Sequence, residues 1–366
     1  MTLSWIGLDA RMIRHTGIGT YLRGLLGALD PQDLPAAPVL FGPDDLLTAY
    51  PAFNRKSFTA PIYSLREQRD YPEHLKACRL WHAPHYNVPF FKGRARLVVT
   101  IHDLIHWIYR GKFFSPAQAF YARTMLGRAV KTADHILTVS ENTRADLIRH
   151  FNADAARITV TPEAADAKFK PCDDTIRIGA FKQRLGLPEN YFLYVGSLKP
   201  HKNVLWLVQL YRELYRDGKV KAELVLAGRK DRKYPAGYAA LAELENGQGI
   251  RLVSALSDED LLTLYHGALA LLHPSLYEGF GLTLLEAMAS GTPVAAFRTA
   301  SVPEVTGEAA LLAEPDDAAA FTQMILHLER EAALREDLKQ LGLARASRFS
   351  WRKMAAQTAA VYRKLL

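Results

Sequence analysis

The stretch HPSLYEGFGLTLLEAMASGTP, residues 273–293, decides how the rest of this chain is interpreted. An apolar run at residues 268–272 leads into it and predicts a buried strand. A Gly-Phe-Gly turn at residues 279–281 follows, and then an apolar segment that predicts a helix ending near Gly291 and Pro293. A strand, a glycine turn and a helix N-terminus together present unpaired backbone N–H groups at the positive end of a helix dipole. The stretch therefore predicts a binding site for an anionic group.

Two glutamates stand on either side of this turn. Glu278 immediately precedes the glycines, and Glu286 falls inside the predicted helix among leucine, alanine and methionine. A carboxylate is costly to bury there unless hydroxyl or amide groups bond to it. A purely structural interpretation has Glu286 capping local amides and Glu278 in solvent. Two acids that frame a Gly-Phe-Gly turn after His-Pro-Ser favour a binding function instead.

The pattern of Glu278, seven residues and then Glu286 resembles the signature of the family 4 retaining glycosyltransferases of the GT-B fold. The resemblance extends over essentially the whole chain. It implies that Glu286 holds the ribose hydroxyls of a sugar nucleotide. It also implies that Glu278 and the backbone after it face the donor sugar. That backbone comprises Gly279, Phe280, Gly281 and Leu282.

The order of predicted elements indicates an α/β chain with two domains. Apolar runs that predict strands alternate with helical or turn segments, at residues 3–9, 80–83, 96–101, 136–139 and 158–161, and again at residues 191–195, 223–227, 250–252, 268–272 and 293–297. Such alternation is typical of parallel sheets covered by helices on both faces. We expect the GT-B architecture, with two doubly wound Rossmann-like domains facing each other across a cleft. Prolines break residues 31–78 too often for a long helix to be predicted, and what this segment binds stays open.

The predicted boundaries follow this alternation. Residues 1–170 form an N-terminal acceptor-side domain, 171–189 a linker with a short helix, and 190–350 a C-terminal nucleotide-sugar-binding domain. Residues 351–366 follow a predicted N-cap, Ser350, and carry one apolar helical face. By resemblance to the fold, this last helix is expected to cross back onto the first domain.

Two further loops are expected to contact the donor. Gly17 and Gly19 lie before a predicted helix at residues 20–29 and resemble the loop that approaches the donor diphosphate, although such glycines also serve tight turns without a ligand. In GSLKPHKNV, residues 196–204, Lys202 precedes a helix whose dipole disfavours a cation at that end. A bound diphosphate would offset this conflict, and the resemblance places Lys202 on the phosphates.

The second cation of the diphosphate site is left open by the sequence. Many members of the family have an Arg near the end of the preceding strand, where this chain has Ser197. The candidates for the second cation are Arg229, Lys230 and His201. Ser197 and Arg229 are therefore kept among the predicted donor-binding residues.

Histidines gather near the predicted carboxyl ends of two strands of the first domain, where doubly wound sheets bind ligands. The segment TIHDL, residues 100–104, resembles the catalytic-cleft motif of the family, which implies that His102 contacts the donor sugar and stabilises the transition state. The segment HAPHYNVP, residues 82–89, also resembles a segment of the family, which implies that His85 and Asn87 lie on the acceptor side, and Asp103 is expected there too. No metal site is expected, because no carboxylate or cysteine completes a spacing typical of zinc.

The composition excludes several other classes of protein. The chain has 366 residues, 49% of them hydrophobic, which is enough for two cores. No apolar run approaches the roughly 18 residues of a membrane span, and the first residues predict a strand instead of a signal peptide. Cys78 and Cys172 are too few for a disulfide framework. We therefore expect a cytosolic chain.

Positive charge is concentrated in the predicted first domain. Residues 1–170 contain 22 Lys and Arg against 15 Asp and Glu, a net charge of +7, whereas the whole chain carries +8. Peripheral contact with an anionic membrane, on the cytoplasmic face of the inner membrane, and a merely soluble basic surface explain this charge equally well. No nucleic-acid-binding motif accompanies it, so nucleic acid is not expected as a partner.

The resemblance implies transfer of a hexose from a nucleotide diphosphate sugar to a saccharide or lipid-linked acceptor, with retention, in cell-surface polysaccharide assembly. Likeness to bacterial members favours GDP-mannose as donor over a UDP- or dTDP-hexose. Cations and helix ends at the diphosphate favour metal-independent chemistry without a cofactor. No residue is identified as a covalent nucleophile, which favours front-face displacement. A non-catalytic sugar-nucleotide- or glycan-binding module, an epimerase and a phosphorylase of related fold are the alternatives.

Overall fold

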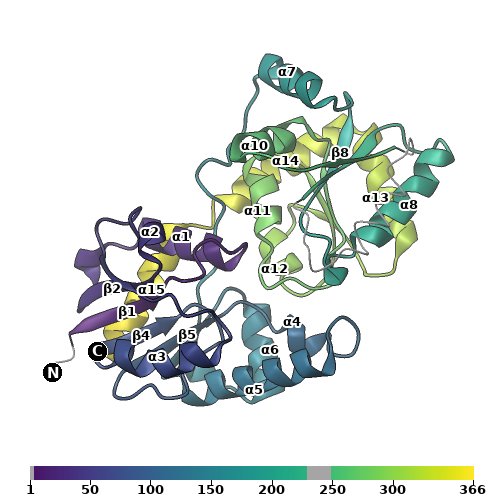
Figure 1. Cartoon of the computed structure of the whole chain (residues 1–366). Coiled ribbons are helices and arrows are strands. Elements are labelled where there is room, and N and C mark those ends of the chain that lie inside the picture. Colours follow the sequence, from purple (N-terminus) through teal and green to yellow (C-terminus); the bar gives the residue numbers. More distant parts are fainter. Residues whose placement is uncertain (1–3, 229–248) are drawn as a thin grey trace. The chain divides into compact units, whose positions relative to one another are not determined.

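The computed structural model describes residues 4–228 and 249–366, which form two compact units. Unit 1 comprises residues 1–164 and 350–366, and unit 2 comprises residues 165–349. Each unit is built around one parallel sheet (Figure 1). Two of the candidate cations, Arg229 and Lys230, lie outside the described residues. No helix within the described ranges is both long and apolar enough to cross a bilayer.

Unit 1 contains a seven-stranded parallel sheet in the order β3-β2-β1-β4-β5-β6-β7. Its strands are β1 (Trp5–Asp9), β2 (Ala37–Gly42), β3 (Asn54–Ser57), β4 (Cys78–Ala83), β5 (Arg96–Ile101), β6 (His135–Thr138) and β7 (Ile158–Val160). The sequence order reverses between β1 and β4, which are neighbours in the sheet. In doubly wound sheets, ligands bind beyond the carboxyl ends of the strands at such a reversal.

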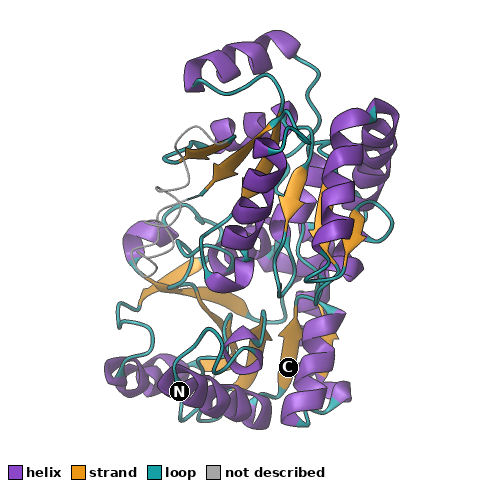
Figure 2. Ribbon diagram, turned by 90° about the vertical axis from the view of Figure 1, so that its right-hand side faces the viewer, coloured by secondary structure: helices purple, strands orange, loops and turns teal. Residues whose placement is uncertain are grey.

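Helices cover both faces of this sheet (Figure 2). They are α1 (Ile18–Ala28), α2 (Asp44–Leu47), α3 (Leu65–Leu75), α4 (Ile105–Ile108), α5 (Pro116–Thr132) and α6 (Glu141–Phe151), with short 3-10 turns at Pro31–Asp33 and Ala155–Arg157. The segment 31–78, which could not be assigned from the sequence, contains β2, β3 and α3. The edge strand β3 has four polar, exposed residues, and α3 contains Pro72 in its interior, so neither has the pattern that predicts its element.

The last helix, α15 (Trp351–Leu365), belongs to unit 1 and packs against α1, which confirms the expected return of the chain (Figure 1). Ser350 caps it by accepting a hydrogen bond from the Lys353 N–H. The Trp351 ring lies so close to Gly24 that a Cβ at this glycine would be 2.3 Å from it. The contact between the two helices therefore requires glycine at position 24.

Unit 2 contains a six-stranded parallel sheet in the order β10-β9-β8-β11-β12-β13. Its strands are β8 (Tyr191–Val195), β9 (Glu223–Ala227), β10 (Ile250–Val253), β11 (Leu271–His273), β12 (Val294–Phe297) and β13 (Leu311–Ala313). Its helices are α7 (Thr175–Leu185), α8 (Val204–Arg216), α10 (Asp258–Gly267), α11 (Leu282–Ala289), α12 (Val302–Thr306), α13 (Ala318–Arg330) and α14 (Ala332–Ala346), with a 3-10 turn at Pro200–Lys202. The sequence order reverses between β8 and β11.

Two boundaries differ from those expected. The division between the units falls at Ala164 and Ala165, before the predicted position 170. The expected linker at residues 171–189 is part of unit 2, because it contains α7, which packs against α10. Prolines and acidic residues around this helix resemble a linker in composition, and only its tertiary contacts assign it to the domain.

Candidate active site

The predicted site residues form two groups, one in each unit, at the carboxyl ends of strands next to the point where sheet order reverses. In unit 2 they follow β8 and β11, and in unit 1 they follow β1, β4 and β5. This is the edge at which a doubly wound sheet binds its ligands.

The centre of the unit 2 group is an ionic cluster, the Lys202 cluster, formed by the half-buried Lys202 and the buried Glu278 and His273. The Lys202 Nζ lies 2.6 and 2.8 Å from the two carboxylate oxygens of Glu278. His273 Nε2 donates to Glu278 Oε1 at 3.0 Å. Burial by itself would raise the pKa of Glu278, but Lys202 and His273 outweigh it and hold this pKa well below its usual range. Glu278 is therefore a carboxylate, and it is not the solvated side chain of the structural interpretation.

The Gly-Phe-Gly loop is held by a side chain that sequence reasoning did not single out. The Ser301 hydroxyl donates to the carbonyl oxygens of Glu278 and Phe280, at 3.0 and 2.9 Å. Gly281 has a φ of 102° and begins α11 without a side-chain cap, so the first N–H groups of the helix stay available to a ligand. The Phe280 side chain is buried against Phe349, so only the backbone of this residue can serve the predicted donor site.

Glu286 lies on α11 in a different environment. Its Oε2 accepts a hydrogen bond from the hydroxyl of buried Tyr265 at 3.0 Å. Burial raises the pKa of Glu286 to about 7, although the Tyr265 hydrogen bond acts in the opposite direction. Among the described residues, no backbone amide donates to the Glu286 carboxylate, whereas the structural interpretation requires such a contact. Near neutral pH it is poised between a neutral and an ionised form.

The loop after β8 is positioned by backbone contacts. The Leu276 N–H donates to the His201 carbonyl at 2.8 Å, which ties the turn that contains Lys202 to the segment before Glu278. The Ser197 carbonyl accepts a hydrogen bond from the Tyr194 hydroxyl at 2.8 Å. A donor-binding role of Ser197 stays a prediction.

In unit 1, His102 follows β5 and is held by a hydrogen bond from one ring nitrogen, while the other faces a carboxylate. Nε2 donates to the Pro84 carbonyl at 3.0 Å, and Nδ1 lies 3.6 Å from Glu163 Oε1. The Tyr21 ring meets the imidazole edge to face, with centroids 4.9 Å apart. Glu163 is buried and was missed by sequence reasoning, although its place just beyond strand β7 could have indicated it.

Beneath His102, a buried chain of hydrogen bonds joins the sheet to helices α1 and α15. The Tyr21 hydroxyl bonds Thr100 Oγ1 at 2.9 Å, and Thr100 bonds His82 Nε2 at 2.7 Å. His82 Nδ1 bonds the Tyr362 hydroxyl at 2.6 Å. Burial lowers the pKa of His82 to about 3, so this histidine is neutral. His82 is therefore a core residue.

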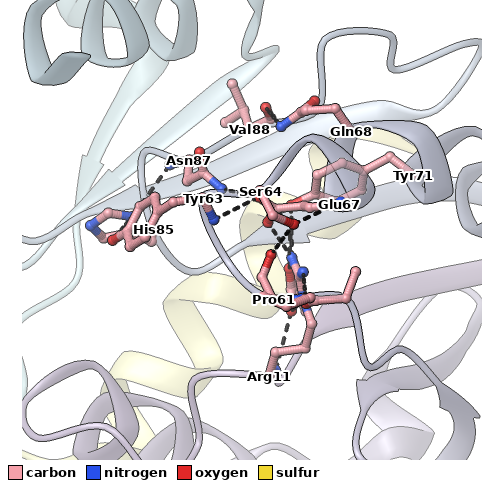
Figure 3. A network of polar contacts seen from close by, with 12 residues as sticks. Arg11, Pro61, Tyr63, Ser64, Glu67, Gln68, Tyr71, His85, Asn87 and Val88 are labelled. Carbon is pink, nitrogen blue, oxygen red and sulfur yellow. Dashed lines mark hydrogen bonds and ion pairs between the residues drawn. The ribbon is translucent and has the colours of Figure 1, made fainter.

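A second ionic cluster of unit 1, the Arg11 cluster, consists of Arg11, Asp9 and Glu67 (Figure 3). The Arg11 guanidinium donates to Asp9 at 2.9 and 2.5 Å and to Glu67 at 2.6 Å. Glu67 is fully buried, and its other oxygen accepts from Asn87 Nδ2 at 2.6 Å and from the Tyr63 N–H at 3.0 Å. Asn87, predicted on the acceptor side, is therefore part of this network.

The remaining predicted residues have mixed surroundings. Asp103 Oδ1 accepts from the Ile105 N–H at 3.0 Å, which stabilises the turn into α4. A Cβ at Gly19 would lie 2.5 Å from the Ile13 carbonyl oxygen, so local packing alone requires this glycine. Gly17 has a φ of 72° and open space beside its Cα. Contact of either glycine with a diphosphate stays a prediction.

Comparison with known proteins agrees with this geometry. The family described as "Glycosyltransferase Family 4" matches residues 16–169, and "Glycosyl transferases group 1" matches residues 178–344. O-antigen chain mannosyltransferase B of Escherichia coli is 32% identical over 304 residues, which span 83% of this chain and 77% of that protein. O-antigen chain mannosyltransferase RfbU of Salmonella typhimurium is 30% identical over 251 residues, which span 67% of this chain and 64% of that protein.

The fold is shared with solved structures over nearly the whole length. The structure of Anabaena Alr3699/HepE in complex with UDP and glucose has a TM-score of 0.78 and 17% identity, and covers 98% of this chain and 99% of that chain. Two doubly wound parallel sheets, the spacing of Glu278 and Glu286, and relatives above 30% identity point to one family. The chain therefore belongs to the family 4 glycosyltransferases of the GT-B fold, and it is similar to bacterial mannosyltransferases of polysaccharide assembly.

Proposed function

We propose that this glycosyltransferase moves a mannosyl residue from GDP-mannose to a hydroxyl of a saccharide or lipid-linked acceptor, with retention of configuration. The names of the two O-antigen chain mannosyltransferases support mannose as the sugar. The UDP and glucose in the HepE structure support a nucleotide sugar as the class of donor. The observation that carries the proposal is the Lys202 cluster at the start of α11, with Glu286 farther along the same helix.

Each part of the donor has a candidate partner in unit 2. The ionised form of Glu286 accepts hydroxyl hydrogen bonds, as a ribose diol requires. Lys202 supplies positive charge, and the uncapped N–H groups at the start of α11 supply donors for the diphosphate. Because a cation and a helix end are available to stabilise the charge of the diphosphate, the reaction is proposed to proceed without a metal ion or another cofactor.

In the proposed reaction, the bond between sugar C1 and the diphosphate oxygen breaks while the acceptor oxygen bonds to C1 on the same face. The acceptor proton passes to the leaving diphosphate. Positive charge develops on the ring and negative charge on the leaving group, which Lys202 and the amides of α11 stabilise. Both oxygens of Glu278 are held by Lys202, and one also by His273, which argues against Glu278 as a covalent nucleophile. His102 is proposed to contact the donor sugar, with Glu163 orienting its ring.

A lipid-linked acceptor would bring unit 1 to an anionic membrane surface. The net charge of +7 on residues 1–170 supports this contact. The loop before β5 carries two exposed phenylalanines, Phe90 and Phe91, next to exposed Arg94. Co-sedimentation with vesicles that contain phosphatidylglycerol, and not with neutral vesicles, is expected. Binding that persists in Phe91→Ala with Arg94→Ala would rule out this loop as the contact.

The donor is tested by thermal stabilisation with GDP, UDP, dTDP and ADP and their sugars, each with and without magnesium. GDP and GDP-mannose are expected to raise the melting temperature most, to the same extent in EDTA, and this effect is expected to disappear in Glu286→Ala. A larger stabilisation by another nucleotide would replace the proposed donor, and a requirement for magnesium would overturn metal independence.

The reaction is tested by following GDP release and the anomeric configuration of the product with saccharide acceptors. Lys202→Ala and Glu286→Ala are expected to abolish transfer, whereas the matched surface variant Lys219→Ala retains it. Donor binding without transfer or hydrolysis in the unmodified protein would instead support a non-catalytic binding module. An inverted product would contradict front-face displacement.

A further inference from the structure

Tyr63 has a backbone conformation that an aromatic residue rarely adopts. Its φ is 66°, in the left-handed region, and its side chain is 51% exposed. A bulky residue in this region is strained, and glycine would relieve the strain without leaving a hole in the core. Such strain persists where surrounding contacts over-determine the conformation, and it concentrates at functional sites.

The contacts that hold Tyr63 come from the Arg11 cluster. The Tyr63 N–H donates to Glu67 Oε2 at 3.0 Å, and Glu67 is fixed through its other oxygen by Arg11 (Figure 3). The neighbouring Ser64 caps α3 by accepting from the Glu67 N–H, and it donates to the Pro61 carbonyl. Both the buried carboxylate and the helix start therefore force Tyr63 to turn its ring outward.

Two more aromatic rings lie beside the Tyr63 ring. Tyr63 meets Tyr121 and His85 edge to face, with centroid distances of 5.8 Å in each pair. The Tyr121 hydroxyl donates to Asn87 Oδ1 at 2.6 Å, so Asn87 connects Tyr121 to Glu67. Burial lowers the pKa of His85 to about 3, with repulsion from His102 and His106 as smaller causes, so this ring is uncharged. Tyr121 is 37% exposed, which leaves ring surface free for a ligand.

A small pocket adjoins these rings and is lined by Asp9, Arg11, Glu67, Pro84, His85 and Asn87, among others. Its two carboxylates face one guanidinium, which disfavours an anionic ligand. The guanidinium nitrogens are already bonded to Asp9, Glu67, Tyr71 and the Ala60 carbonyl. The carboxylate oxygens in turn already accept hydrogen bonds, so no charge in the pocket is left uncompensated. The pocket thus suits a small neutral group such as a sugar hydroxyl.

We propose that Tyr63, Tyr121 and His85 form a platform for one uncharged sugar ring of the acceptor, with ring hydroxyls directed to the pocket beside Glu67 and Asn87. A pyranose presents an apolar C–H face to an aromatic ring and hydroxyls at its rim, and tyrosine offers rigid, amphipathic contact area at low entropic cost. Pro84 lines the pocket, and its carbonyl accepts the His102 hydrogen bond, which places the platform next to the residue assigned to the reacting sugar. The inference rests on the proposed saccharide acceptor.

The decisive variant is Tyr63→Gly, which removes the ring and also the strain at φ 66°. With α-linked mannose disaccharides as acceptor, its KM for acceptor is expected to rise about tenfold, while its kcat and its affinity for GDP-mannose stay near those of the unmodified protein. Its melting temperature is expected to be unchanged or higher. Tyr63→Trp, which restores an aromatic surface, is expected to recover most of the acceptor affinity.

Asn152→Gly is the matched control, because Asn152 also has a left-handed φ, 50°, at the C-cap of α6 and touches none of these rings. It is expected to leave the KM for acceptor unchanged. An unchanged KM for the acceptor in Tyr63→Gly would overturn the platform. The Tyr63 side chain would then be held in a strained conformation without contacting a ligand. A KM that rises together with the dissociation constant for GDP-mannose would also overturn it.

Saccharide binding measured by saturation-transfer NMR, without donor, separates this inference from the proposed function. Contacts of the disaccharide that disappear in Tyr63→Gly support the platform even if no transfer is observed, and absence of transfer to any saccharide by the unmodified protein contradicts only the proposed function. Equal contacts in both proteins, or none in the unmodified protein, overturn the platform.

Discussion

The Arg11 cluster of unit 1 and the Lys202 cluster of unit 2 look alike in composition but differ in what they leave available. Each holds a cation against carboxylate oxygens at 2.5–2.8 Å, although Arg11 is buried and Lys202 only half-buried. Arg11 also bonds Tyr71 and a carbonyl, so its network joins β1, α3 and the segment before α3. For Lys202, Glu278 is the one hydrogen-bond partner within the described residues, and the ammonium retains donor capacity.

This difference indicates that an ion pair can act as a structural scaffold or as a binding site. Which of the two it does depends on how many hydrogen bonds its cation can still donate to a ligand. A planar guanidinium surrounded by acceptors holds distant segments in one geometry. An ammonium on a turn, facing a single carboxylate beside an uncapped helix start, can be shared with a ligand. Variants in the Arg11 cluster should therefore cost stability, and those in the Lys202 cluster should cost activity.

The largest effect is expected for Glu67→Gln, which leaves Arg11 with one carboxylate in a buried site. Removing one partner of a buried pair costs about 3 kcal/mol or more, and urea denaturation monitored by tryptophan fluorescence would measure it. The exposed Glu73, which pairs with Lys76, provides the control, and Glu73→Gln is expected to leave the midpoint unchanged. Equal urea midpoints for the two variants would show that the Arg11 cluster does not act as a scaffold.

Lys202→Met is expected to lower kcat by about 100- to 1,000-fold, because a preorganised charge at the leaving diphosphate is lost. It also leaves Glu278 without its cation, so the pKa of Glu278 should rise toward its ordinary range. Initial rates of GDP release, compared with those of Lys219→Met, would measure the effect. A rate within about threefold of the unmodified protein would show that Lys202 is as structural as Arg11.

Glu286 is expected to make both the stability of the protein and its affinity for the donor depend on pH. Its pKa is raised to about 7 from 4.5, so the folded protein binds a proton more tightly than the unfolded chain, and stability falls as pH rises through this window. Affinity for GDP-mannose should rise over the same window as the carboxylate ionises, by about tenfold between pH 6 and 8. Calorimetric titration is the measurement, and GDP-mannose is used because its diphosphate has no titrating proton near pH 7.

Glu286→Gln is the control for both effects. The variant should bind GDP-mannose weakly and without this pH dependence. At pH 8 it should be more stable than the unmodified protein by about 1–3 kcal/mol, and near pH 4.5 the two should be equally stable. A parallel pH dependence in both proteins would assign the titration to another group.

The smallest effect is expected for Tyr362→Phe, which removes one hydrogen bond from the buried chain that ends at Tyr21. The loss should be about 1 kcal/mol, because His82 Nδ1 is left without its partner. Donor affinity should not change, since this chain belongs to the scaffold of unit 1. A lowered kcat with unchanged stability would instead indicate that α15 positions His102 through Thr100 and Tyr21.

The two units also differ in how far the sequence predicted them. The Lys202 cluster lies on two loops, and each loop carries its motif in consecutive residues. The sequence therefore indicates directly which residues of a loop lie close together. Glu278 and Glu286 were predicted from their positions around the glycine turn and from resemblance to the family, and both flank or lie on α11 as expected. His273 and Ser301 were not identified as partners, because a hydrogen bond to a carboxylate or a carbonyl has no local pattern.

In unit 1, the residues that matter most come from separate elements. Arg11 follows β1, Glu67 lies on α3, Asn87 follows β4 and Tyr121 lies on α5. No spacing links them, and the segment that carries Tyr63 and Glu67 could not be assigned at all. The prediction of Asn87 and His85 on the acceptor side came from resemblance, and the network around them was visible only in the folded unit.

The alternation of the two sheets and the motif around α11 could be predicted from the sequence, because they depend on periodicity, caps and contiguous loops. The family and the return of α15 were predicted from resemblance. The tertiary structure alone decided that Glu67 binds Arg11, that α7 belongs to unit 2, that Glu286 is held near its titration point and that Tyr63 is forced outward. The physical reason is the range of the interactions. Local patterns can be recognised from residues that are adjacent in the sequence, whereas burial, ion pairing and strain arise only when distant segments pack together.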